Sequence, residues 1–90
     1  MVEILYTDSY LKRARKFIEK HPDLLSQYEK TLKLMEINPY HPSLRLHKLR
    51  GKLSELYSVS INISYRITIF FIIQDDKIIP IDIGSHDEVY

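Results

Sequence analysis

Hydrophobic residues follow two different spacings in the two halves of this chain. Up to residue 37 they recur every three or four positions, which is typical of helices with one buried face. From residue 57 onward they alternate with other residues, which is typical of β-strands. We therefore predict an α+β fold: a small antiparallel β-sheet with two N-terminal helices packed on one face. The length of 90 residues predicts a single domain, 1–90.

The first half predicts two helices joined by a tight corner. Asp8 or Ser9 is the expected cap of the first helix, and His21-Pro22 is its expected end. Pro22 suits the first turn of the second helix, which Asn38-Pro39 ends. The predicted buried faces are Tyr10, Leu11, Ala14, Phe17 and Ile18 in the first helix, and Leu24, Leu25, Tyr28, Leu32 and Met35 in the second.

Strand patterns precede and follow the helices. The predicted strands cover residues 2–6, 57–63, 65–73 and 78–83, with a turn at 74–77. The strand over 57–63 has one polar face, which begins at Ser58. Pro80 has no N–H to donate to a neighbouring strand, so we expect it where that group would face away from one.

Basic residues are concentrated in two places, although the formal net charge is only +1. One cluster, Lys12 to Lys16, is predicted to be a solvated helix face. The other lies between Ile37 and Ser54, where the chain has no Asp or Glu. The prolines and glycine there predict an irregular connection with exposed basic residues. These residues are Arg45, His47, Lys48, Arg50 and Lys52.

Several classes of protein are excluded by composition. The absence of cysteine excludes disulfides and thiolate zinc sites, and the four histidines lack ligand spacing, so we expect no metal and no other cofactor. No apolar run is long enough to span a membrane, and the N-terminal residues do not form a signal peptide pattern. The sequence therefore predicts a cytoplasmic protein with no membrane contact.

The chain ends in Gly84-Ser85-His86-Asp87-Glu88-Val89-Tyr90, directly after a predicted strand. A histidine titrates near neutral pH and can move protons. A tyrosine offers a ring for base stacking and a phenolic proton. These C-terminal residues therefore indicate a functional site, provided that positive charge lies beside them.

Three motifs together resemble the RelE/ParE superfamily of bacterial toxins, in its RelE and YafQ-like (RelE/StbE) branch. These motifs are His47-Lys48-Leu49-Arg50-Gly51, Leu56-Tyr57 followed by Tyr65-Arg66-Ile67, and Ile83 to Tyr90. The resemblance implies the toxin of a type II toxin-antitoxin system, of the kind associated with plasmid stabilization. It implies a ribosome-dependent mRNA endonuclease (an mRNA interferase) that inhibits translation until a cognate antitoxin neutralises it.

Cleavage of RNA without a metal needs a base for the 2′-hydroxyl proton, cations for the charge at phosphorus and an acid for the departing oxygen. On the resemblance, His86 is the acid or base, Arg66 stabilises charge, and Tyr90 stacks on a base or supplies a proton. His47 matches the family's loop histidine and is the second proton-transfer candidate. The expected phosphate contacts are Arg45, Lys48, Arg50 and Lys52.

Other interpretations stay open. YafQ-like toxins carry a histidine and an acid where this chain has Ser60 and Ser64, so a non-catalytic antitoxin-binding or autoregulatory module is an alternative to the nuclease. A ParE-type inhibitor of DNA gyrase is a further alternative. Arg66 could also pair with Asp82 on the adjacent strand.

The expected partners are mRNA on the ribosome and an antitoxin. We expect the antitoxin to be acidic and partly disordered and to place an amphipathic helix on the basic surface. The sequence does not decide whether the chain forms homo-oligomers.

Overall fold

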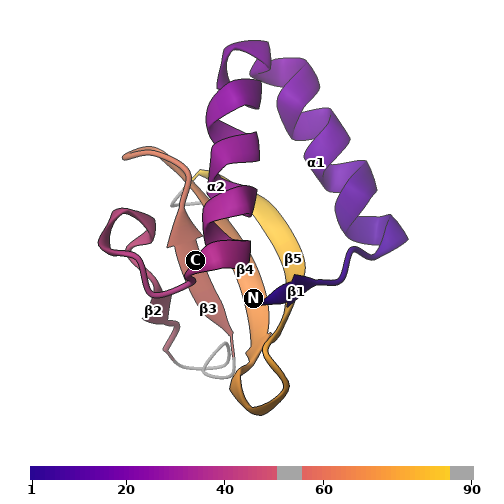
Figure 1. The fold of residues 1–90 in the computed structure, drawn as a ribbon. Coiled ribbons are helices and arrows are strands. Elements are labelled where there is room, and N and C mark those ends of the chain that lie inside the picture. The colour runs from indigo at the N-terminus through magenta and orange to yellow at the C-terminus, as the bar shows by residue number, and fades with distance from the viewer. Residues whose placement is uncertain (51–55, 86–90) are drawn as a thin grey trace.

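A computed structural model describes residues 1–50 and 56–85 of the chain. Its helices and strands confirm the α+β class (Figure 1). Short 3₁₀ turns, labelled η, join several of them. In chain order the elements are β1 (Glu3–Ile4), α1 (Asp8–Lys20), η1 (Pro22–Leu24), α2 (Leu25–Ile37), η2 (Pro42–Leu44), β2 (His47–Lys48), β3 (Tyr57–Ser60), β4 (Tyr65–Ile72), η4 (Ile73–Asp75) and β5 (Lys77–Ser85).

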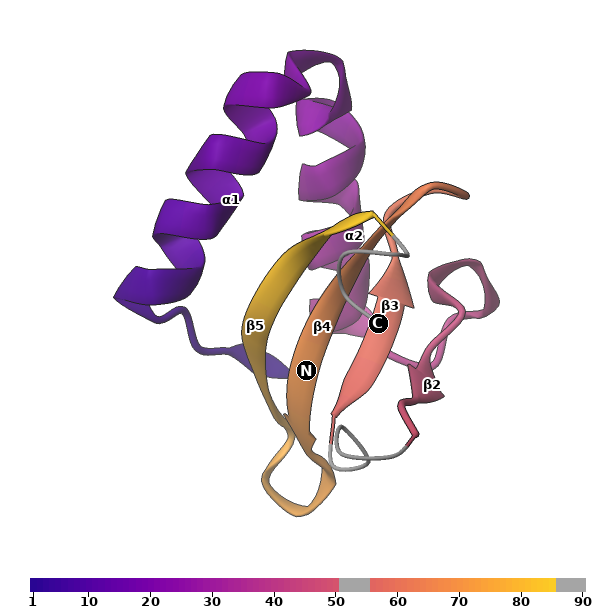
Figure 2. The same ribbon diagram turned by 180° about the vertical axis from the view of Figure 1, so that it is seen from behind.

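The strands form one sheet in the order β1-β5-β4-β3-β2. Both helices cover the same face of this sheet, and Figure 2 shows the sheet in front with the helices behind it. The pairs β2–β3, β3–β4 and β4–β5 are antiparallel, as expected. The prediction of a wholly antiparallel sheet is wrong at β1, which pairs in parallel with β5. Two helices and three strands separate β1 from β5 in the sequence, and after them β5 runs in the same direction as β1.

The core lies between the helices and the sheet. Tyr10 and Met35 from the helices pack with Ile67, Ile69 and other apolar residues of the strands. Two residues of the predicted helix faces are instead exposed. Leu11 follows Tyr10 by one position, which turns it about 100° away from the buried stripe. Leu25 is exposed because the 3₁₀ turn η1 directs Leu24 inward just before α2 begins.

The N-terminal cap of α1 is Thr7. Its Oγ1 atom accepts a hydrogen bond from the backbone N–H of Tyr10 at 3.1 Å. The expectation that Asp8 or Ser9 caps the helix is therefore wrong by one or two residues. Both residues lie inside the first turn, where the Asp8 carboxylate complements the positive end of the helix dipole. The predicted end of this helix at His21 is confirmed.

Pro80 lies at an irregular point of β5. It pairs with Ile69, whereas Asp82 pairs with Thr68, so Ile81 is one residue too many for the register. Among residues 1–50 and 56–85, the parallel pairing with β1 reaches only as far as Ile78. The proline therefore lies where β5 has a strand neighbour on one side, as predicted for a residue without an N–H.

The strand predicted over 57–63 ends earlier, at Ser60. Residues 61–64 turn the chain into β4, and the side chain of Ile63 is 89% exposed. Asn62 closes this turn, because its Oδ1 atom accepts hydrogen bonds from the N–H groups of Ser64 and Tyr65.

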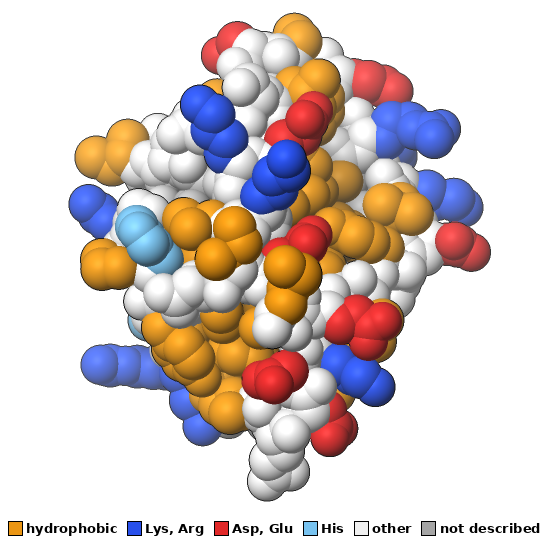
Figure 3. Space-filling model, in the orientation of Figure 1, with side chains coloured by type: hydrophobic (Ala, Val, Ile, Leu, Met, Phe, Trp, Pro, Cys, Tyr) orange, Lys and Arg blue, Asp and Glu red, His pale blue; other side chains and the backbone are white. Residues whose placement is uncertain are grey.

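The predicted irregular connection from Asn38 to Lys52 is only partly irregular. It contains η2 and the strand β2, whose His47 and Lys48 pair with β3. Figure 3 shows Lys, Arg and His side chains along this left side of the molecule, without acidic ones on that visible edge.

Candidate functional site

A cluster of polar residues lies on the sheet face turned away from the helices. The register pairs His47 with Ser58, Ser58 with Thr68, and Ser60 with Arg66, and paired residues share a face. The alternate residues of the same strands belong to the core. We call these five residues the polar cluster. Despite their polarity, Ser58, Ser60, Arg66 and Thr68 are all buried.

Arg66 is held by neighbours from two other segments of the chain. Its Nε atom donates a hydrogen bond to Ser58 Oγ on β3. Its Nη2 atom lies 3.2 Å from the carbonyl oxygen of Arg45 and 3.2 Å from His47 Nδ1. The side chain is only 9% exposed. Because a guanidinium donates in fixed directions, these contacts define where its plane lies.

Asp82 takes part in a different interaction. Its Oδ1 atom lies 3.8 Å from Arg13 Nη1 of α1 and accepts a hydrogen bond from the N–H of Ile83. Arg13 also donates to the carbonyl oxygen of Ile81 at 3.1 Å. The pairing of Arg66 with Asp82, one of the sequence alternatives, is therefore not the arrangement found.

The contacts of His47 fit either tautomer of the neutral ring. Its Nδ1 atom lies 3.2 Å from both Arg45 O and Arg66 Nη2. A proton on Nε2 lets Nδ1 accept from Nη2, but it turns the lone pair of Nδ1 toward the carbonyl oxygen. A proton on Nδ1 lets that atom donate to Arg45 O, but it places the two donors Nδ1–H and Nη2–H side by side. In both tautomers Arg45 O accepts from Nη2.

Arg45 has a backbone role that its residue type does not reveal. It adopts the left-handed conformation, with φ of 49° and ψ of 46°, at the end of η2. This conformation is uncommon for a residue with a Cβ. Its N–H donates to Pro42 O at 3.1 Å, and its own carbonyl oxygen meets Arg66. The turn thus brings a carbonyl acceptor to the polar cluster, while the Arg45 side chain is exposed.

The hydroxyl of Thr68 is buried and has no hydrogen-bond partner within residues 1–50 and 56–85. The side chain is 4% exposed. The residue lies directly across from Ser58, whose Oγ atom binds Arg66. From the sequence, Ser58 is one of the uncharged residues of a polar strand face, and no role was predicted for Ser58 or Thr68. A register based on a turn at 61–64 would have placed both beside Arg66.

The remaining predicted site residues are spread differently. Arg45 precedes β2, Lys48 belongs to it and Arg50 follows it, and all three residues are exposed. Lys52, His86 and Tyr90 lie outside the described residues. The structure thus brings His47 and Arg66 together. The roles predicted for His86 and Tyr90 stay predictions.

Ser60 and Ser64 occupy the end of β3 and the turn after it. Ser60 Oγ donates to the carbonyl oxygen of Asn62 at 2.6 Å, and Ser64 is exposed. Within residues 1–50 and 56–85, no group of three His, Cys, Asp or Glu side chains could hold a metal ion. No described helix is both long and apolar enough to cross a membrane.

Comparisons with known proteins find similar structures but no similar sequence families. No protein-family model matches the sequence, and no curated protein sequence is significantly similar to it. Among solved structures, it is similar to a copper-bound mutant toxin from Helicobacter pylori, with 24% identity, full coverage of both chains and a TM-score of 0.73. It is also similar to a chain of the DinJ-YafQ toxin-antitoxin complex from E. coli, with 15% identity, 99% and 97% of the two chains covered and a TM-score of 0.77.

A third similar structure is the YoeB-YefM complex from Staphylococcus aureus, with 18% identity, 96% and 98% coverage and a TM-score of 0.71. The similarity extends over nearly the whole length of each chain. The protein therefore has the fold of these toxin structures, which is the fold that the resemblance in the sequence implied.

Proposed function

We propose that this protein is the toxin of a type II toxin-antitoxin pair and that it cleaves mRNA on the ribosome without a metal ion. The fold is that of proteins whose solved structures are described as toxins. The observation that carries the nuclease proposal is the contact between Arg66 and His47, at 3.2 Å. It joins a permanently charged group to a proton-transfer group on one face of the sheet.

Each residue has a role that follows from its chemistry. Arg66 stabilises the negative charge that develops on the phosphate oxygens. His47, with its proton on Nε2, donates a proton or a hydrogen bond from that atom. Removal of the 2′-hydroxyl proton is left to His86, and Tyr90 stacks on a base or supplies a second proton. The exposed side chains of Arg45, Lys48 and Arg50, together with Lys52, contact the RNA backbone.

The proposed protein partner is an antitoxin. The DinJ-YafQ structure is described as a toxin-antitoxin complex. The basic, acid-free segment between Ile37 and Ser54 offers charge complementarity to an acidic peptide that folds on binding. Because its substrate is translated mRNA, the toxin acts in the cytoplasm.

The test is cleavage of mRNA on purified ribosomes, with transcript ends mapped before and after addition of the protein. Arg66→Ala should abolish cleavage and growth arrest while leaving the fold intact. Arg13→Ala, which removes an exposed arginine of α1, is the control and should cleave like the parent. Transcripts that stay intact with the unsubstituted protein would refute the nuclease proposal, and inhibited DNA supercoiling would then support the ParE-type alternative.

A second candidate is a non-catalytic module that binds the antitoxin. It is favoured by Ser60, which is occupied by its bond to Asn62 O and cannot act as an acid or base near neutral pH. Harmless overexpression together with tight antitoxin binding would support this alternative.

A further inference from the structure

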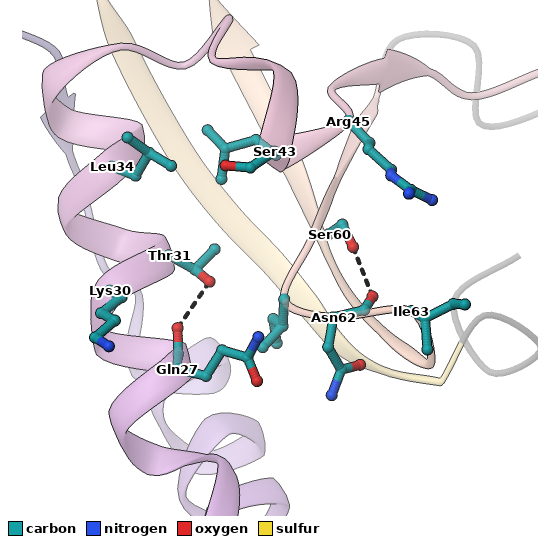
Figure 4. A pocket seen from close by; sticks show the side chains of 11 residues that line it. Gln27, Lys30, Thr31, Leu34, Ser43, Arg45, Ser60, Asn62 and Ile63 are labelled. Atoms are coloured by element: carbon teal, nitrogen blue, oxygen red, sulfur yellow. Dashed lines mark hydrogen bonds between the residues drawn. The ribbon is translucent and has the colours of Figure 1, made fainter.

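A cavity of about 410 Å³ lies between α2 and the turn that joins β3 to β4 (Figure 4). Leu34 of α2 and Ile61 of the turn give it apolar walls, and the exposed Ile63 stands beside it. Its volume is in the range of pockets that hold one small ligand. A nucleobase has two apolar faces and a polar edge, so walls of this kind suit it.

The charges that line the cavity have a single sign. Lys30 of α2 and Arg45 after η2 are both among the lining residues, and the described residues that line the cavity include no Asp or Glu. A ligand that carries phosphate next to an apolar group fits a cavity that combines cationic lining residues with apolar walls.

Two side-chain amides at the cavity have unused hydrogen-bonding groups. The Oδ1 atom of Asn62 accepts hydrogen bonds from the N–H groups of Ser64 and Tyr65 at 2.8 and 2.9 Å. The NH₂ group of the same side chain takes no part in these bonds and can donate to a ligand. The amide of Gln27 makes no hydrogen bond with any described residue, and Figure 4 shows the side chain reaching from α2 toward the strands. Asn and Gln amides recognise base edges through paired donors and acceptors.

Two residues that line the cavity also contact or pair with Arg66 of the polar cluster. Ser60 lines it and lies directly across from Arg66 in the sheet. Arg45 also lines it, and its carbonyl oxygen binds Arg66 Nη2. A strand of RNA with one phosphate at Arg66 and a neighbouring base in the cavity would pass along these two residues.

We infer that this cavity is a nucleobase pocket, which binds one base of single-stranded RNA beside the phosphate held at Arg66. The inference rests on the proposed function for the identity of that phosphate. The Gln27 amide and the Asn62 NH₂ group read the edge of the base, and Lys30 contacts the backbone beyond it.

The experiment is an NMR titration of the full chain, labelled with ¹⁵N, with short 2′-O-methyl RNA homopolymers, which resist cleavage. The side-chain NH₂ signals of Gln27 and Asn62 report directly on the pocket. One homopolymer should shift these signals more strongly than the others. Gln27→Glu and Asn62→Asp should weaken binding of that homopolymer by about 5- to 100-fold, since a base-reading pair is lost. Asn62→Asp keeps the oxygen that closes the turn.

The matched control is Gln74→Glu, the same change in η4 at the other end of the sheet, and it should leave the discrimination between homopolymers unchanged. Binding that does not move the two amide signals, or that moves them equally with every homopolymer, overturns the pocket. An acidic peptide that moves them when RNA does not would also overturn it and assign the cavity to a protein partner.

The pocket and the nuclease can fail separately. Selective shifts at Gln27 and Asn62 without cleavage on ribosomes would support the pocket and refute the nuclease. Cleavage with an unchanged base preference in both pocket variants would support the nuclease and refute the pocket.

Discussion

The Nη2 atom of Arg66 lies 3.2 Å from the Nδ1 atom of His47, although 19 residues separate the two in the sequence. Both atoms also lie 3.2 Å from the same acceptor, the carbonyl oxygen of Arg45. The position of the guanidinium and the location of the imidazole proton are therefore linked. A change at any one of the three residues should be felt at the other two.

Arg66→Lys should impair both cleavage and stability. An ammonium keeps the charge but cannot reach Ser58, Arg45 and His47 together, because it lacks the planar fork of the guanidinium. Loss of a placed charge donor lowers cleavage rates by about 10²–10³-fold. The buried Ser58 hydroxyl also loses its partner, which costs about 1–3 kcal/mol in the free energy of unfolding.

Cleavage rates and urea unfolding measure these two effects. Arg13→Lys is the matched control, since Arg13 is exposed and lies 3.8 Å from Asp82, and it should change neither quantity appreciably. Full activity in Arg66→Lys would show that charge alone suffices at this position.

His47→Asn and His47→Gln should separate two roles of the imidazole. The Asn oxygen lies near the place of Nδ1 and can accept from Arg66, whereas the Gln nitrogen lies near Nε2 and can donate there. Both variants lose proton transfer, which lowers the cleavage rate by about 10²–10⁴-fold. His47→Asn should keep the stability of the parent, and His47→Gln should lose about 1 kcal/mol.

The tautomer itself is measured by the ¹⁵N shifts of the His47 ring. The role that we propose for His47 requires an unprotonated Nδ1 and a protonated Nε2 in the neutral ring. The reverse assignment would mean that His47 donates to Arg45 O and that Arg66 is held without it.

Arg45→Gly should be more stable than Arg45→Ala. Both changes remove the guanidinium, so both should weaken RNA binding to the same degree. Only the alanine keeps a Cβ in the left-handed conformation, which costs about 1–2 kcal/mol. Thermal unfolding of the two variants measures the difference, and equal stability would show that the turn has another conformation in solution.

The fold was readable from the sequence where a single pattern decides it. Helical spacing and proline located α1 and α2 to within a few residues, because each helix buries one stripe. Alternation located β4 and β5 for the same reason. It failed at Ile63, which continues the alternation beyond the end of β3, because the bonds of Asn62 had already turned the chain.

The candidate site was readable in part. Arg66 and His47 were found through the resemblance to a toxin family. Ser58 and Thr68 were missed because their burial depends on pairing between strands, which residue types alone do not give. The contribution of Arg45 is a backbone carbonyl, so no side-chain pattern could have indicated it.

Thr68→Val should stabilise the protein by about 1 kcal/mol. Valine has nearly the same shape and removes a buried hydroxyl that has no hydrogen-bond partner among the described residues. Thr31→Val is the matched control: the Thr31 hydroxyl donates to Gln27 O at 2.8 Å, so its removal should bring no gain. Chemical unfolding measures both. A destabilised Thr68→Val would show that the hydroxyl finds a partner in solution.

Alkaline pH should unfold the protein through a buried pair of phenols. Tyr10 and Tyr28 join α1 to α2 by a hydrogen bond of 2.8 Å between their hydroxyl groups. Burial, and then the neighbouring Tyr28, raise the pKa of Tyr10 far above the ordinary value of 10.0. Burial also raises the pKa of Tyr28. The folded protein therefore keeps protons that the unfolded chain releases above about pH 10, so its stability falls as the pH rises beyond that value.

Tyr10→Phe should reduce this loss of stability. Each phenol that stays protonated only in the folded state contributes about 1.4 kcal/mol per pH unit, so the variant should show a slope that is shallower by up to this amount. Tyr40→Phe, which removes an exposed phenol, is the control and should keep the slope of the parent. The measurement is the free energy of unfolding in urea between pH 9 and pH 11. Parallel curves for Tyr10→Phe and the parent would show that the Tyr10 hydroxyl loses its proton as readily in the folded protein as in the unfolded chain.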